Sequence, residues 1–174
     1  MSVATIFEIQ LIVGFVPWLL CVGAYVWPSL RAMDRVAAQR AIATLHSFRF
    51  FGLVFLIPGV VGINLPLGFA AFAAYGDFAT GVLAMLALLT IRVRPLFWMC
   101  VVAFNVVGML DILVDYYHAI QFDLPSRAGQ LGAAYAIPIL YVPLLVITHV
   151  VSVYLLARPQ PKSVRLLASA PSAS

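Results

Sequence analysis

Long runs of apolar residues alternate with short polar breaks along this 174-residue chain. Each run is about twenty residues long, the length that an α-helix needs to cross a hydrocarbon layer of roughly 30 Å. The runs predict five transmembrane helices, at residues 5–27, 42–63, 69–91, 96–118 and 132–157. The sequence therefore predicts an all-α fold, a polytopic membrane helical bundle that forms a single domain over residues 1–157.

The breaks between the runs hold residues that end helices or need contact with water. Pro28 follows the first run, Pro66 the second and Pro95 the third, while residues 123–130 form a polar loop before the fifth. The tail at 158–174 is rich in Pro, Ser and Ala and has too few apolar residues to pack. We expect this tail to be disordered and cytoplasmic.

The basic residues indicate how the helices are oriented. Most of them lie between the first and second predicted helices, between the third and fourth, and in the tail. They are Arg31, Arg35, Arg40, Arg92, Arg94, Arg158, Lys162 and Arg165. With five helices these regions share one side, which the positive-inside rule assigns to the cytoplasm, so the topology is N-out/C-in. We expect an integral, multi-pass protein of a bacterial cytoplasmic (inner) membrane.

Composition narrows the classes of partner. Hydrophobic residues make up 64% of the chain and charged residues only 9%, which excludes an ordinary soluble domain. The basic residues flank apolar runs instead of forming a patch, so nucleic acid is excluded as a partner and the lipid bilayer is the expected surrounding. Cys21 and Cys100 both lie within apolar runs and indicate neither a disulfide framework nor a zinc site.

The fourth predicted helix carries the densest set of costly polar groups. Asp111, Asp115 and His118 share one sector of this helix, and Asp77 is expected at the same depth on the third helix. Carboxylate oxygens with an imidazole suit a divalent cation, and neighbouring carboxylates can also pass protons. These four residues are the predicted metal or proton site. The alternative is structural: solvated interfacial groups and hydrogen bonds to neighbouring helices.

Two histidines on different helices form a second candidate site. His46 and His149 are expected at one depth, as bis-imidazole haem ligation requires, with Arg49 facing a propionate. The alternative is that both histidines bind helix carbonyls and that Arg49 extends toward lipid phosphates. Arg49 is expected to have no carboxylate at its own depth, so its counter-charge would come from an anionic ligand, a lipid headgroup or a partner subunit.

Common catalytic motifs are absent, including Gly-x-Ser-x-Gly, a phosphate loop, His-Glu-x-x-His and Cys-x-x-Cys. Short loops and small residues on the helices favour docking over soluble-phase catalysis. The first hypothesis is an accessory or scaffold subunit that binds a membrane-protein partner or further copies of itself. The alternatives are a cation- or proton-binding or translocating protein, a haem b electron carrier, and a membrane-embedded enzyme acting on a lipid or isoprenoid.

Overall fold

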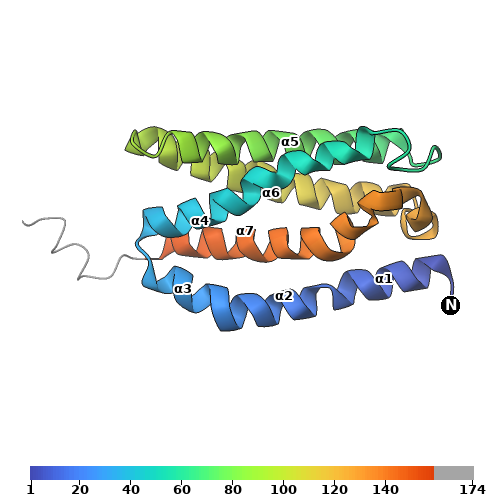
Figure 1. Cartoon of the computed structure of the whole chain (residues 1–174), viewed down its shortest axis with the longest axis horizontal. Helices are drawn as coiled ribbons and strands as arrows, with labels where there is room; N and C mark the ends of the chain where they lie inside the picture. The colour runs from blue at the N-terminus through green and yellow to red at the C-terminus, as the bar shows by residue number, and fades with distance from the viewer. Residues whose placement is uncertain (159–174) are drawn as a thin grey trace, which may run out of the picture.

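The computed structural model describes residues 1–158, and all of its named elements are helical (Figure 1). In chain order they are α1 (Val3–Val13), α2 (Phe15–Cys21), η1 (Val22–Val26), α3 (Trp27–Ala32), α4 (Arg35–Ser47), η2 (Phe48–Leu56), α5 (Leu67–Leu89), α6 (Arg94–Gln121), η3 (Pro125–Tyr135), η4 (Ile137–Tyr141) and α7 (Val142–Ala157). The all-α prediction is confirmed for this part of the chain. The predicted tail disorder concerns residues 159–174, which lie outside the described residues.

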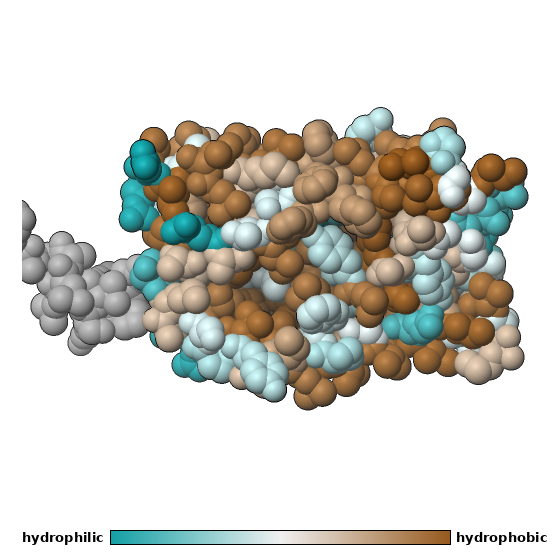
Figure 2. Space-filling view, viewed as in Figure 1, coloured by the Kyte–Doolittle hydropathy of each residue, from teal (hydrophilic) through white to brown (hydrophobic). Residues whose placement is uncertain are grey.

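Four helical segments are long and apolar enough to cross a membrane. They are Val3–Ala32, which joins α1, α2, η1 and α3, then Leu67–Leu89, Arg94–Gln121 and Ile137–Ala157. Hydrophobic residues cover most of the face shown in Figure 2, and hydrophilic residues gather toward its two ends. A protein that crosses a bilayer needs this distribution, because hydrocarbon cannot solvate polar groups.

The second predicted helix, at 42–63, differs from the structure at both ends. α4 already begins at Arg35, because the carboxylate of Asp34 accepts two backbone N–H bonds and caps the helix. The segment stops before Ile57, since a residue that precedes a proline, here Pro58, favours extended backbone. α4 and the 3-10 helix η2 together form one broken helical segment that starts seven residues earlier than predicted.

In two of the four long apolar segments, π-helical turns lie next to prolines. η1 directly precedes the turn with Pro28, and η4 contains Pro138 and precedes Pro143. A proline lacks the N–H that a helix uses, and the wider π turn absorbs the missing bond without ending the helix. The first predicted helix, expected to stop at residue 27, therefore continues to Ala32.

The polar loop predicted at 123–130 is largely helical, since η3 begins at Pro125. It is tied to the loop that follows η2, because the N–H of Gly62 donates to the carbonyl of Gln130 over 2.7 Å. The side-chain oxygen of Gln130 also accepts from the N–H of Asn64 over 3.2 Å. These bonds join the two connections at one end of the bundle.

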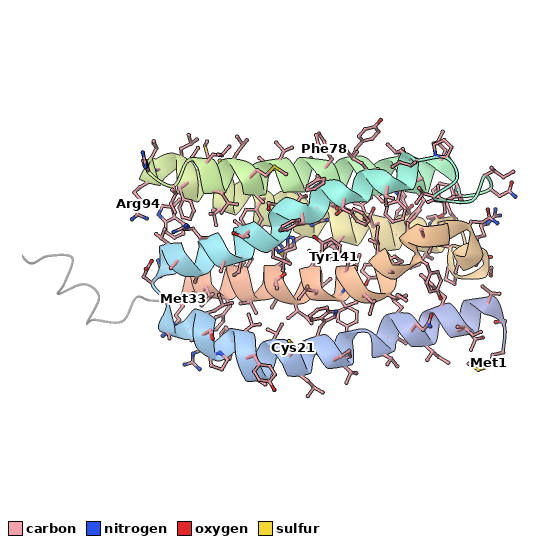
Figure 3. The ribbon with its side chains drawn as sticks, viewed as in Figure 1. Met1, Cys21, Met33, Phe78, Arg94 and Tyr141 are labelled. Carbon is pink, nitrogen blue, oxygen red and sulfur yellow. The ribbon has the colours of Figure 1, made fainter. Side chains whose placement is uncertain are left out.

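The core consists of two apolar clusters at different heights along the bundle. Figure 3 labels Met1 at one end and Arg94 at the other, and we name the two ends after these residues. The cluster near the Met1 end contains Phe55 and Phe69, and the cluster near the Arg94 end contains Phe97. Between them lies a layer of buried polar side chains, supplied by α4, η2, α5, α6 and α7.

Candidate functional site

A buried arginine occupies the centre of the polar layer. Arg49, near the start of η2, is 1% exposed. Its Nε donates to Asp77 Oδ1 over 2.6 Å, and its Nη2 donates to Asp111 Oδ2 over 2.5 Å. Both carboxylates are also buried, on α5 and α6. We call these three residues the buried ion-pair group.

Glycines allow the helices to approach closely enough for this group to form. A Cβ atom at Gly52 on η2 would collide with the carboxylate of Asp77, and a Cβ at Gly76 on α5 would collide with Asp111 Oδ1. The polar side chains thus lie in spaces left by absent side chains on neighbouring helices.

The expectation that Arg49 has no carboxylate at its own depth is wrong, as both ion pairs show. The cause is the earlier start of α4. Seven additional residues at 1.5 Å per residue move Arg49 about 10 Å further from the Arg94 end, to the level of Asp77 and Asp111. No external counter-ion is needed to explain the buried arginine.

His149 on α7 completes the surroundings of the guanidinium. Arg49 Nη1 lies 3.1 Å from His149 Nε2, and an arginine can only donate, so Nε2 is the acceptor. The proton of the neutral ring is then on Nδ1, which donates to Asn105 Oδ1 over 3.1 Å. Arg49 Nη1 also lies 3.4 Å from the carbonyl of Gly108. The guanidinium is therefore held by groups from α5, α6 and α7.

His46 and His149 share one depth, as expected, but their rings lie directly side by side, with centroids 4.0 Å apart. Thr148 Oγ1 donates to a carbonyl of its own helix and so accepts from His46 Nε2 over 3.1 Å. His46 Nδ1 is buried and has no partner. Bis-imidazole ligation requires a macrocycle between the two rings, but these rings are in direct contact. His46, His149 and Arg49 as arranged here do not fit haem.

A further polar pair extends the layer toward the Arg94 end. The side chain of Gln39 on α4 donates to the carbonyl of Ser152 over 3.0 Å, and Ser152 Oγ donates back to Gln39 Oε1 over 2.7 Å. Gln39 is not among the predicted site residues, because the predicted helix begins at residue 42. The spacing of Gln39, His46 and Arg49 would have revealed it, since seven and then three residues keep all three on one helical face.

Asp115 and His118 lie on the Met1 side of the ion-pair group. Asp115 Oδ1 and His118 Nδ1 are buried atoms without a hydrogen-bond partner. The His118 ring packs edge-on against Phe72 at a centroid distance of 4.9 Å. Asp77 and Asp111 of the predicted metal site instead hold Arg49. Among the described residues, no group of three or more His, Cys, Asp or Glu side chains is arranged to hold a metal ion.

Together these residues form a column of polar side chains along the bundle. We call it the polar column; it consists of Gln39, His46, Arg49, Asp77, Asn105, Asp111, Asp115, Thr148, His149 and Ser152. Its chemistry is unbalanced, because three carboxyl groups accompany a single guanidinium. Such an arrangement can bind protons, because protonation removes the excess negative charge that burial disfavours.

Comparison with known proteins assigns the chain to a family. No curated protein and no solved structure matches it. One family model matches residues 6–157, which include the whole of the polar column. The chain therefore belongs to the family described as Domain of unknown function (DUF8737).

Proposed function

We propose that this protein binds protons in its polar column and passes them across a membrane. The observation that carries the proposal is the buried ion-pair group with Asp115 one helical turn beyond Asp111. A single arginine offsets one carboxylate, so the other two favour a bound proton or cation when surrounded by hydrocarbon. A proton relay requires groups that take up a proton and release it again when the charges around them change, and carboxyl groups in excess over the arginine can do so.

The column supplies side chains suited to proton transfer on both sides of the ion-pair group. Toward the Met1 end lies Asp115, which has a free oxygen. Toward the Arg94 end lie His149 and His46, with rings in contact, followed by the Gln39–Ser152 pair. Carboxylates and imidazoles are the usual carriers of protons in proteins.

The proposed membrane topology has five spans: the four long apolar segments and, second in chain order, α4 together with η2. The proposed orientation is N-out/C-in. In support, the α3–α4 junction, the α5–α6 turn and the end of α7 all lie at the Arg94 end in Figure 1. Arg31, Arg35, Arg92 and Arg158 lie in or next to these connections. By the positive-inside rule this end faces the cytoplasm, and a bacterial inner membrane is the proposed location.

Proton flux into liposomes tests the proposal. Purified protein is reconstituted into vesicles with an internal pH-sensitive dye, and a potassium diffusion potential drives proton entry. We expect the wild type to conduct and Asp111→Asn to reduce the rate at least about tenfold, since a carboxamide cannot carry the proton. Asp34→Asn is the matched control, because Asp34 is exposed and asparagine also caps helices.

Equal flux in the wild type and the Asp111→Asn variant would refute the role of the column. A wild type that does not conduct would refute proton transfer by this chain alone. The accessory-subunit hypothesis would then stand first, and partners that co-purify in mild detergent would be sought.

A further inference from the structure

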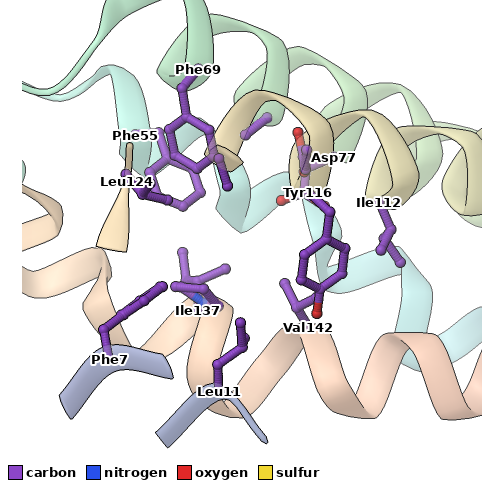
Figure 4. A pocket seen from close by; sticks show the side chains of 14 residues that line it. Phe7, Leu11, Phe55, Phe69, Asp77, Ile112, Tyr116, Leu124, Ile137 and Val142 are labelled. Atoms are coloured by element: carbon purple, nitrogen blue, oxygen red, sulfur yellow. The ribbon is translucent and has the colours of Figure 1, made fainter. Parts of the chain in front are cut away.

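A cavity beside the polar column has walls that are almost entirely apolar. Phe7 and Leu11 of α1 line one side, and Phe55 and Phe69 contribute aromatic rings from η2 and α5. Figure 4 shows Asp77 and Tyr116 across the cavity from these α1 side chains. The cavity is small, with room for water-sized spheres in about 60 Å³ of it. A space of this size suits a slim alkyl chain better than a bulky ring system.

The polar groups of the cavity are concentrated and acidic. Its polar lining residues are Asp77, Asp115 and Tyr116, and none of the residues that line it is Lys, Arg or His. Asp77 already holds Arg49, but Asp115 Oδ1 is buried without any partner. A buried acceptor without a donor is unfavourable, so an occupant that donates to Asp115 would be stabilised.

Charge identifies the class of donor. Asp115 stands one helical turn from Asp111, and the guanidinium of Arg49 is already bound by Asp77 and Asp111. A cationic donor offsets the negative charge of Asp115 and forms a charge-assisted hydrogen bond, which is stronger than a neutral one. An anionic occupant would be repelled by the same groups.

The rim of the cavity indicates the route of entry. Leu11, Tyr116 and Ala119 line it and are only half-buried, so α1 and α6 leave it open at the side. Leu11 lies eight residues from the start of α1 and Tyr116 five residues from the end of α6, or about 12 Å and about 8 Å along the helices. In a membrane-spanning bundle this rim faces the acyl chains beneath the lipid headgroups.

We propose that this cavity binds a lipophilic amine, with its ammonium group on Asp115 and its alkyl chain between α1 and α5. The ligand enters sideways from the membrane. This inference goes beyond proton transfer and does not depend on it, since the cavity and the unpartnered oxygen exist whether or not the column conducts.

Three probes with one chain length and different head charges test the proposal: octylamine, octanol and octanoate. Equilibrium dialysis of radiolabelled octylamine against purified full-length protein in detergent gives the saturable component of binding. We expect saturable binding to the wild type that neither octanol nor octanoate displaces. Asp115→Asn should weaken it about tenfold or more, since the ionic partner is lost.

Two further variants make the test independent of folding defects. Asp123→Asn changes an exposed carboxylate beyond the end of α6 and keeps a residue type that tolerates its positive φ, so binding should not change. Leu11→Trp fills the cavity from α1 without altering its charge and should abolish binding.

The outcomes distinguish failure of the cavity proposal from failure of proton transfer. Displacement by octanol as effective as by octylamine would overturn the cationic class of ligand. Absence of saturable octylamine binding in a protein that conducts protons through Asp111 would overturn the cavity proposal and leave proton transfer intact. Binding that requires Asp115 in a protein without proton flux would support the cavity proposal and refute the relay.

Discussion

At the residue scale, the position of Arg49 is determined by its acceptors. Every nitrogen of its guanidinium has an acceptor within 3.4 Å, provided by Asp77, Asp111, His149 and the carbonyl of Gly108. Removing one member of a buried ion pair costs more than removing the whole set, because an unpaired charge remains in a medium of low polarity. The stability lost on truncating one member of the buried ion-pair group therefore reflects mainly the remaining charges that are left unpaired.

Arg49→Met should destabilise the protein by about 3–5 kcal/mol, because it leaves Asp77 and Asp111 without their cation. The triple variant Arg49→Met, Asp77→Asn, Asp111→Asn should recover most of this loss, since no buried charge is left. Unfolding in sodium dodecyl sulfate, followed by circular dichroism, measures both. Arg40→Met, at an exposed position of α4, is the control and should change stability by less than about 0.5 kcal/mol. A triple variant less stable than the single variant would contradict this account.

At the element scale, the close approach of α5 to α6 depends on missing side chains. Gly76→Ala places a Cβ against Asp111 Oδ1 and should destabilise the protein by about 1–3 kcal/mol, as overpacking does. Gly23→Ala is the matched helical control, because nothing lies within 4 Å of its added Cβ. Thermal unfolding in detergent measures both variants. Equal unfolding midpoints for the two variants would show that α5 can move away from α6 without loss of stability.

Sequence patterns predicted much of the site but not its centre. The spacing of Asp111, Asp115 and His118 predicted one sector of α6, and each of them has a buried polar atom in the structure. The expected common depth of His46 and His149 agrees with the contact between their rings. The partners of Arg49 were not predictable without the correct start of α4. That start depends on the cap at Asp34, whose two local hydrogen bonds lie within a polar stretch where apolar periodicity gives no boundary.

Helix type was a second source of error. A 3-10 segment such as η2 rises about 2.0 Å per residue instead of 1.5 Å and turns its side chains differently. No residue between Phe48 and Leu56 signals this form, because phenylalanine, leucine and valine occur in either helix. Pro28 predicted the end of the first helix, because a proline indicates a break but not that a π turn can carry the helix past it.

At the scale of the whole molecule, the proposed topology predicts which positions reach each aqueous side. With Cys21 and Cys100 replaced by Ala, single cysteines at Ser2 and Gly129 should react with a membrane-impermeant maleimide in spheroplasts that display the outer side. A cysteine at Met33 should react only after the membrane is opened, because it lies in the α3–α4 connection. Reaction of Ser2→Cys and Met33→Cys from the same side would contradict the five-span arrangement.

The half-buried rim between α1 and α6 has a consequence for how the chain would sense its ligand. A site reached from the acyl chains samples the concentration dissolved in the membrane, not the concentration in water. Each added methylene favours partitioning into lipid by about 0.8 kcal/mol, or roughly fourfold at room temperature. Within a homologous series of amines that the cavity holds equally well, the dose needed in the medium should therefore fall steeply with chain length. Solubility in the membrane would then act as the first selectivity filter.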